Sequence, residues 1–279
     1  FIFVLINHSS ESFASLTKLG LLIKLNYTIM QKIIFTAFSL LFGLLNVMAQ
    51  GENEDQRFQQ HPDLKIKGTS VVFDERLDQL IFTIEVEGAA GQTQPAAFGQ
   101  VDGAPVLGYV FPTTLQATDV GFSATEGIVA LALTSHPDFD DTPLWDENND
   151  QNYGNDGVIW HPHWVVLTPD QRVAGGLAVK QFQADDASVK LPPTNPGMPM
   201  YMDSPGFPVI ARDHTIRVVV PAYRLNYKTQ FQFDAVTAYM QVNISNSAYP
   251  MLGVYKVYAV ASGDLSLPSR GVNRISDSR

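Results

Sequence analysis

Short apolar runs, rich in β-branched and aromatic residues, leave few folds open to this chain. In 80–87 the apolar residues alternate with polar ones, which is the period of a strand that buries one face. The run 127–134 is apolar almost throughout, as expected of a strand buried on both faces. About nine or ten such runs are separated by turn signals, and no stretch shows a long helical period. We therefore predict an all-β chain that forms an antiparallel β-sandwich of the Ig-like or jelly-roll style, with one long acidic loop.

The predicted strands are unevenly spaced along the chain. Segments 64–73 and 80–87 flank a short turn and are expected to form a hairpin. By contrast, 191–208 contains six prolines and two glycines, which is typical of an irregular excursion. The remaining predicted strands are 106–111, 127–134, 159–167, 177–182, 215–221, 231–244 and 252–260.

The beginning of the sequence predicts an exported protein. The first methionine, Met30, is followed by Lys32, by an apolar stretch of about a dozen residues and by small residues that end at Ala49, which is the pattern of a secretory signal peptide over 30–49. The alternative is a retained N-terminal anchor, although the apolar stretch is shorter than the roughly 20 residues of a membrane span. Residues 1–29 are interpreted as upstream translation that the native protein does not contain. The predicted location is secreted or periplasmic, with no stable membrane span after cleavage.

After residue 49 the sequence is expected to form a single domain. Residues 50–62 are polar and are predicted to be a flexible leader, 63–264 the β-sandwich domain, and 265–279 a polar tail. A domain of this length can bury a sizeable core without covalent cross-links. This matters because the chain has no cysteine, and so has neither a disulfide nor a thiolate for metal binding or catalysis.

The charge balance restricts the partners. Lys and Arg number 18 against 28 Asp and Glu, so the formal net charge is −10 at pH 7. Nucleic acids and anionic membranes are bound through basic patches that neutralise phosphate. The composition therefore disfavours both as partners.

Residues 134–167 concentrate the groups that can carry chemistry. This stretch holds three histidines and seven acidic residues but no lysine or arginine. Imidazoles and carboxylates gathered without basic partners suit cation binding better than ion pairing. We therefore expect a metal-binding protein.

His161 and His163 are the first candidate ligands. Residues i and i+2 of a strand project to one side, so the two imidazoles share a direction. His136 follows the preceding apolar run, and becomes the third ligand if the two strands pair as a hairpin with a long loop. Such a site would hold zinc or copper, with nearby carboxylates as further ligands or as partners of the histidines. The predicted transition-metal residues are His136, His161, His163, Asp138 and Asp140.

A structural interpretation competes with this metal site. Pro162 cannot donate a hydrogen bond to a ladder, so the segment from His161 to His163 could equally mark an edge or a bulge of the sandwich. His61 and His214 stand alone among turn or strand-flanking residues, and are interpreted as structural or solvated.

The loop between those two strands suggests a different cation. Oxygen-bearing side chains recur at alternating positions from Asp146, and this spacing resembles the ligand pattern of EF-hand-type and dockerin-type calcium loops. The sequence departs from that pattern at Gln151, where those loops carry glycine, and at Gly157, where they carry a bidentate glutamate. A solvated turn is the alternative, since Asp, Asn and Gly favour turns. The predicted calcium ligands are Asp146, Asn148, Asp150, Asn152 and Asp156.

Aromatic residues in the same region suggest a recognition surface. Such side chains beside a calcium-supported loop could stack on sugar rings or anchor another protein. The alternative is that at least two of the three tryptophans pack in the core. The predicted ligand-binding residues are Trp145, Tyr153 and Trp164.

Three functions follow from these patterns. The favoured one is a secreted or periplasmic metal-binding protein without enzymatic activity. The second is a calcium-stabilised module that recognises a glycan or a protein. The third is a metal-dependent enzyme, in which three histidines leave a coordination position for water and Asp138 or Asp140 acts as a base or supports the ligands. No Gly-x-Ser-x-Gly, His-Glu-x-x-His, Walker A or Gly-x-Gly-x-x-Gly motif selects a reaction.

Overall fold

The computed structural model describes residues 58–95, 101–136, 159–270 and 273–275. Apart from three short 3-10 helices, these residues are strands, turns and loops, so the prediction of an all-β chain is confirmed. The helices are η1 (Pro62–Leu64), η2 (Ala117–Val120) and η3 (Ala222–Leu225). The predicted upstream segment 1–29, the signal peptide 30–49 and the acidic loop 137–158 lie outside the described residues.

One sheet of five strands has the order β14-β1-β2-β9-β8. Its neighbours are antiparallel, except that β14 runs parallel to β1. The predicted hairpin of 64–73 with 80–87 is confirmed as the pair β1–β2. The strands are β1 (Ile66–Asp74), β2 (Gln79–Val86), β8 (Val209–Arg212), β9 (Thr215–Pro221) and β14 (Asn273–Ile275).

A second, antiparallel sheet of seven strands has the order β4-β3-β11-β12-β6-β5-β7. Its strands are β3 (Ala104–Pro112), β4 (Ile128–Ser135), β5 (His161–Pro169), β6 (Leu177–Val179), β7 (Met202–Asp203), β11 (Val236–Val242) and β12 (Leu252–Val260). A small third sheet pairs β10 (Gln232–Phe233) with β13 (Ser269–Arg270).

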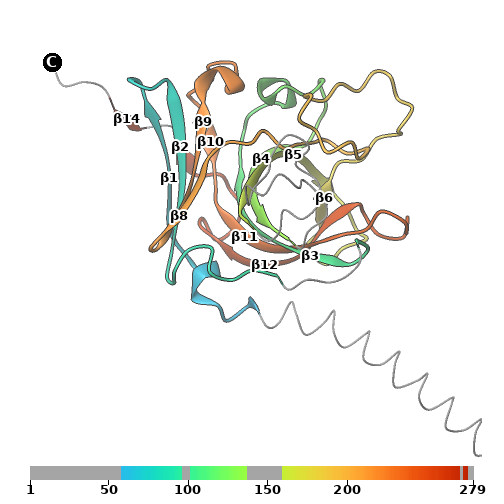
Figure 1. The fold of residues 1–279 in the computed structure, drawn as a ribbon, viewed down its shortest axis with the longest axis horizontal. Coiled ribbons are helices and arrows are strands. Elements are labelled where there is room, and N and C mark those ends of the chain that lie inside the picture. The colour runs from blue at the N-terminus through green and yellow to red at the C-terminus, as the bar shows by residue number, and fades with distance from the viewer. Residues whose placement is uncertain (1–57, 96–100, 137–158, 271–272, 276–279) are drawn as a thin grey trace, which may run out of the picture. The chain divides into compact units, whose positions relative to one another are not determined.

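The seven-stranded sheet closes on itself, which corrects the prediction of a β-sandwich. Strand β4 pairs with β3 on one side and with β5 on the other, from Ile128 opposite Leu167 to Thr134 opposite His161. The result is a six-stranded barrel, with β7 added beside β5. Figure 1 shows this ring beside the sheet that contains β1, β2 and β9. Alternation within a strand shows that one face is buried, but it does not reveal which strands meet at the two edges of a sheet.

Alternate residues of the barrel strands belong to two hydrophobic cores. In β4, Leu131 and Leu133 belong to the core shared with the five-stranded sheet, whereas Ala130 and Ala132 belong to the core inside the barrel. Every residue of β4 after Ile128 is buried. The expectation that 127–134 is buried on both faces is therefore confirmed for the strand itself.

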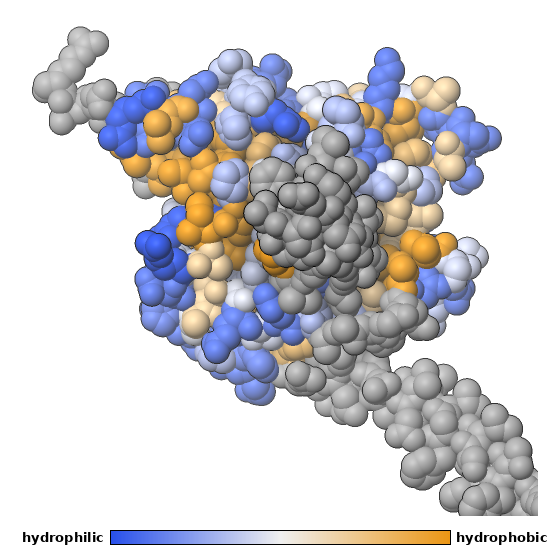
Figure 2. All heavy atoms as spheres, in the orientation of Figure 1, coloured by the Kyte–Doolittle hydropathy of each residue, from blue (hydrophilic) through white to orange (hydrophobic). Residues whose placement is uncertain are grey.

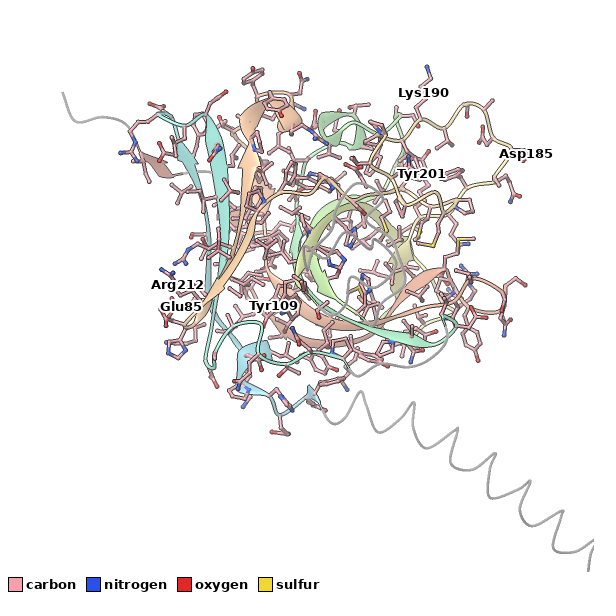
Figure 3. The ribbon with its side chains drawn as sticks, viewed as in Figure 1. Glu85, Tyr109, Asp185, Lys190, Tyr201 and Arg212 are labelled. Carbon is pink, nitrogen blue, oxygen red and sulfur yellow. The ribbon has the colours of Figure 1, made fainter. Side chains whose placement is uncertain are left out.

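The segment before β1 is tied to the barrel wall through Tyr109 of β3, which is labelled in Figure 3. The Tyr109 hydroxyl donates to the Asp63 carbonyl oxygen at 2.8 Å and accepts from the Gly91 amide at 3.0 Å. Burial raises the pKa of this hydroxyl above its usual value. Phe58, which falls in the segment predicted as a leader, is 1% exposed and its ring lies 6.2 Å from that of Tyr239. Residue 58 is therefore part of the packed core.

The surface carries both hydrophilic and apolar side chains. Figure 2 shows them interspersed on one face of the described chain. Large apolar side chains that are more than half exposed are Leu77, Tyr223, Tyr227 and Ile244. Single residues of this kind are ordinary on a protein surface. Within the described ranges, no helix has the length and apolar character needed to cross a membrane.

Gly127 allows β4 to meet β5, and its replacement by alanine is expected to destabilise the fold. Its φ is +144°, and an added Cβ would lie 2.5 Å from Val166 Cγ1 and 2.7 Å from the Leu167 oxygen. We expect Gly127→Ala to lower the free energy of unfolding by about 1–3 kcal/mol, measured by urea denaturation. Gly68→Ala is the matched control, since nothing lies within 4 Å of its added Cβ. Equal stability of the two variants would contradict this account of Gly127.

Candidate metal centre

Three histidines meet where β4 ends and β5 begins. Thr134 of β4 pairs with His161, and Ala132 pairs with His163, while His136 directly follows β4. The pairing of these two strands, which was the condition for His136 to join the other two histidines, is therefore met. The common direction of His161 and His163 is also confirmed, since both lie on the strand face of Val165, which packs inside the barrel.

The three imidazoles form a compact, buried group. His136, His161 and His163 are 3%, 4% and 1% exposed. One ligand nitrogen from each lies within 4.8 Å of the other two. The His136 and His161 rings have centroids 4.6 Å apart, and those of His161 and His163 are 4.8 Å apart. Two nitrogens bound at 2.0–2.1 Å to one ion can be at most about 4.2 Å apart, so nitrogens that are up to 4.8 Å apart must move slightly closer for all three to bind one ion.

The tautomer of His161 leaves a lone pair directed at the group. Its Nδ1 lies 2.8 Å from the Ile159 carbonyl oxygen, which can only accept, so Nδ1 carries the proton when the ring is neutral. Its Nε2 lies 2.8 Å from His136 Nε2. Without a metal this contact is a hydrogen bond donated by His136. With a metal, the same two atoms are ready to coordinate it.

The His163 ring is oriented by β7. Its Nδ1 lies 3.0 Å from the hydroxyl oxygen of Ser204, the residue that follows β7. Strand β7 is held against β5 by the pairing of Asp203 with Trp164. A hydrogen-bond partner of this kind fixes the orientation and tautomer of a metal-binding imidazole. Ser204 therefore has the position of a supporting residue, and no pattern in the sequence indicated it.

Asp203 anchors this support in the protein interior. The Thr194 hydroxyl donates to its Oδ1 at 2.5 Å, and Arg224 Nη2 lies 3.5 Å from its Oδ2. Burial raises the pKa of the Asp203 carboxyl above its usual range, while the Thr194 hydroxyl and the Arg224 guanidinium oppose that rise. These contacts stabilise the short strand that directly precedes Ser204.

The other predicted residues have different outcomes. Trp164 is 1% exposed and packs against Phe82, with ring centroids 6.4 Å apart, so the structure places it in the core instead of on a recognition surface. His61 Nδ1 lies 2.6 Å from Thr93 Oγ1, and His214 Nδ1 donates to the Gly88 oxygen at 2.7 Å. The predicted residues that lie outside the described ranges are Asp138, Asp140, Trp145, Asp146, Asn148, Asp150, Asn152, Tyr153 and Asp156.

The fold and this group define a closed antiparallel β-barrel with three histidines buried at one end of its interior. Comparisons of the chain with protein-family models, with curated proteins and with solved structures find no match. The histidine geometry is therefore the basis for assigning a function.

Ser204 is expected to strengthen metal binding by orienting His163. Ser204→Ala removes that hydroxyl and should weaken metal affinity by about 10-fold, the lower end of the effect of partners that orient ligands. Competition with a chromogenic chelator measures this change. Ser188→Ala is the matched control, because Ser188 is exposed and its hydroxyl donates to Asp186. If Ser204→Ala binds metal as tightly as Ser188→Ala, the Ser204 hydroxyl does not support the site.

Proposed function

We propose that this protein binds one transition-metal ion, zinc or copper, through His136, His161 and His163, and that holding the ion is its role. The observation that carries the proposal is the meeting of three buried imidazoles on two paired strands, with ligand nitrogens within 4.8 Å of one another. Neutral imidazole is a good ligand for both metals.

The surroundings of the histidines support a ligand role over a packing role. The barrel interior next to them is lined by apolar residues such as Val165, Met202 and Val242. Imidazoles are costly to bury there, because their polar nitrogens must be satisfied by hydrogen bonds or by an ion. His136 and His161 partly meet this need by pairing their Nε2 atoms with each other, and an ion shared by the three rings would meet it at the same place.

The interior cavity favours a binding role over catalysis. Three protein ligands leave one coordination position open, as catalytic zinc sites do. However, the neighbouring cavity has a volume of only about 60 Å³. Pockets for drug-sized ligands are roughly 300–1,000 Å³. The described part of the barrel therefore offers little room for an organic substrate beside the histidines.

Two further proposals rest on the sequence alone. A calcium-supported module for glycans or proteins depends on residues 145–156, which lie outside the described ranges. Export to a periplasm or to the medium depends on the signal peptide predicted for 30–49.

Elemental analysis tests the proposed function. The full chain is purified without a His tag or chelator, then incubated with Zn²⁺ or with Cu⁺ under reducing conditions and desalted. We expect about one equivalent of zinc or copper per chain. Absence of both metals after incubation would overturn the proposal. Calcium as the only bound metal would instead support the loop predicted at 146–156.

A further inference from the structure

Methionines line a small pocket that two of the three histidines share. His136 and His163 lie on its wall together with Met198, Met200 and Met202. Met200 and Met202 are 1% and 3% exposed. Thioether sulfur is a soft ligand that selects Cu(I), whereas imidazole suits zinc and copper alike.

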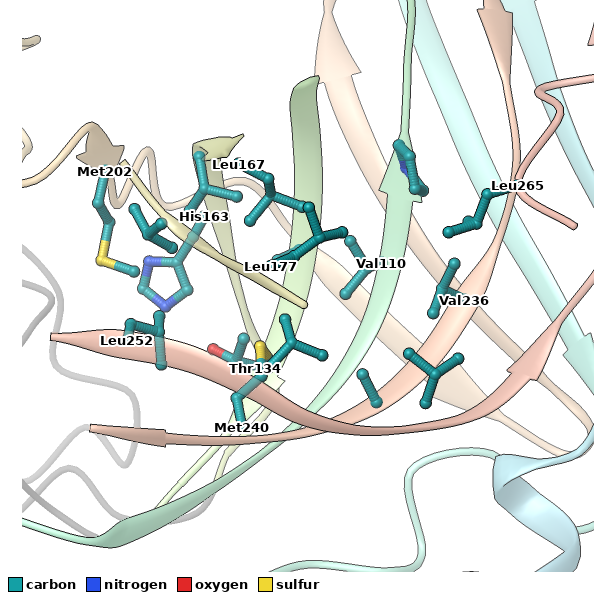
Figure 4. Close-up of a pocket in the computed structure, with 17 residues that line it drawn as sticks. Val110, Thr134, His163, Leu167, Leu177, Met202, Val236, Met240, Leu252 and Leu265 are labelled. Atoms are coloured by element: carbon teal, nitrogen blue, oxygen red, sulfur yellow. The ribbon is translucent and has the colours of Figure 1, made fainter. Parts of the chain in front are cut away.

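Strand pairing places Met202 next to His163. Met202 of β7 pairs with Val165 of β5, and Val165 follows His163 by two residues on the same strand face. Diagonal neighbours of this kind lie within reach of long side chains. Figure 4 shows the Met202 side chain beside the His163 imidazole at one end of the cavity.

The charge of the described site also favours a monovalent ion. Among the described residues, the group that could hold the metal consists of three imidazoles, which are neutral when they bind it. The cost of moving an ion from water into a low-dielectric interior rises steeply with its charge. Cu⁺ therefore loses less hydration free energy than Zn²⁺ on entering a buried site built from neutral nitrogen and sulfur ligands.

From these observations we infer that the preferred metal is Cu(I), and that a thioether from Met200 or Met202 completes its coordination. This inference rests on the proposed histidine centre, since His136, His161 and His163 supply the other ligands. The sulfur ligand occupies the position that a catalytic site would leave to water.

Replacement of the sulfurs separates this inference from the proposed function. The full-chain double variant Met200→Leu/Met202→Leu keeps nearly the same side-chain volume and removes both thioethers. Met240→Leu is the matched control. Met240 is buried and lines the larger barrel cavity, but it does not line the smaller pocket that contains both His136 and His163. Affinities for Cu⁺, under anaerobic reducing conditions, and for Zn²⁺ are measured by chelator competition.

Each outcome has a distinct meaning. We expect the double variant to lose about tenfold or more in Cu⁺ affinity, which corresponds to the loss of one soft ligand, and to keep its Zn²⁺ affinity. Retained Zn²⁺ binding also shows that the variant is folded. Unchanged Cu⁺ affinity would overturn the inference but leave the histidine centre standing. If the unmodified chain binds neither metal, the proposed function itself fails.

As a check that needs no variant, X-ray absorption at the copper edge should show a sulfur neighbour. Its expected distance is roughly 2.3 Å, as for metal–sulfur bonds in proteins. Nitrogen and oxygen neighbours alone would overturn the thioether assignment.

Discussion

Replacing His161 and His163 together by alanine is expected to weaken transition-metal binding by at least about 100-fold. The change removes two of three imidazoles whose ligand nitrogens lie within 4.8 Å of one another. His136 alone cannot enclose an ion. Equilibrium dialysis against Zn²⁺ and Cu⁺, followed by elemental analysis, measures the loss.

The matched control for this change is His61→Ala/His214→Ala. It removes two histidines whose contacts are with Thr93 and with the Gly88 carbonyl, outside the metal-ligand group. The single variant His136→Ala, which changes a residue after the end of β4, repeats the test without altering β5. If the control loses as much metal as the His161/His163 variant, metal binding is not specific to the three buried histidines.

Metal binding is expected to raise the thermal stability of the protein by about 10 °C. A ligand that binds only the folded state at 1,000 times its Kd stabilises it by about 4.1 kcal/mol. Because the three ligands come from β5 and from the residue after β4, the site does not exist in the unfolded chain. For a chain of this size, each kcal/mol raises Tm by about 2–4 °C.

Thermal unfolding followed by circular dichroism, with Zn²⁺ or with a chelator, measures this shift. The His161→Ala/His163→Ala variant should show the same Tm in both conditions. An equal metal-dependent shift in the variant and in the unmodified chain would mean that the stabilising ion binds elsewhere.

Local patterns predicted most of the strands but not their closure into a barrel. The alternation in 80–87 and the apolar run 127–134 correspond to β2 and β4. The sandwich was the wrong architecture because closure depends on which strands pair at the sheet edges, and side-chain alternation is the same in both architectures. Pro162 suggested an edge, and β5 at that residue is paired with β4 alone, since its pairs with β6 and β7 begin at Trp164.

The histidine group was predictable because its geometry is local. His161 and His163 share a strand face by their i, i+2 spacing, and His136 joins them once two consecutive strands pair. Ser204 and Met202 were missed, since they lie in the proline-rich segment 191–208, whose sequence predicts only an irregular course. Both residues reach β5 because the two-residue strand β7 pairs with it, and these strands are well separated in the sequence.

Crystallography of the zinc-loaded protein, with anomalous scattering measured at the zinc edge, tests most directly whether the three histidines share one ion. We predict a single anomalous peak inside the barrel end, with nitrogens of His136, His161 and His163 each about 2.0–2.1 Å away. A zinc peak that lies apart from these imidazoles, or the absence of any zinc peak beside them in zinc-loaded crystals, would contradict the account.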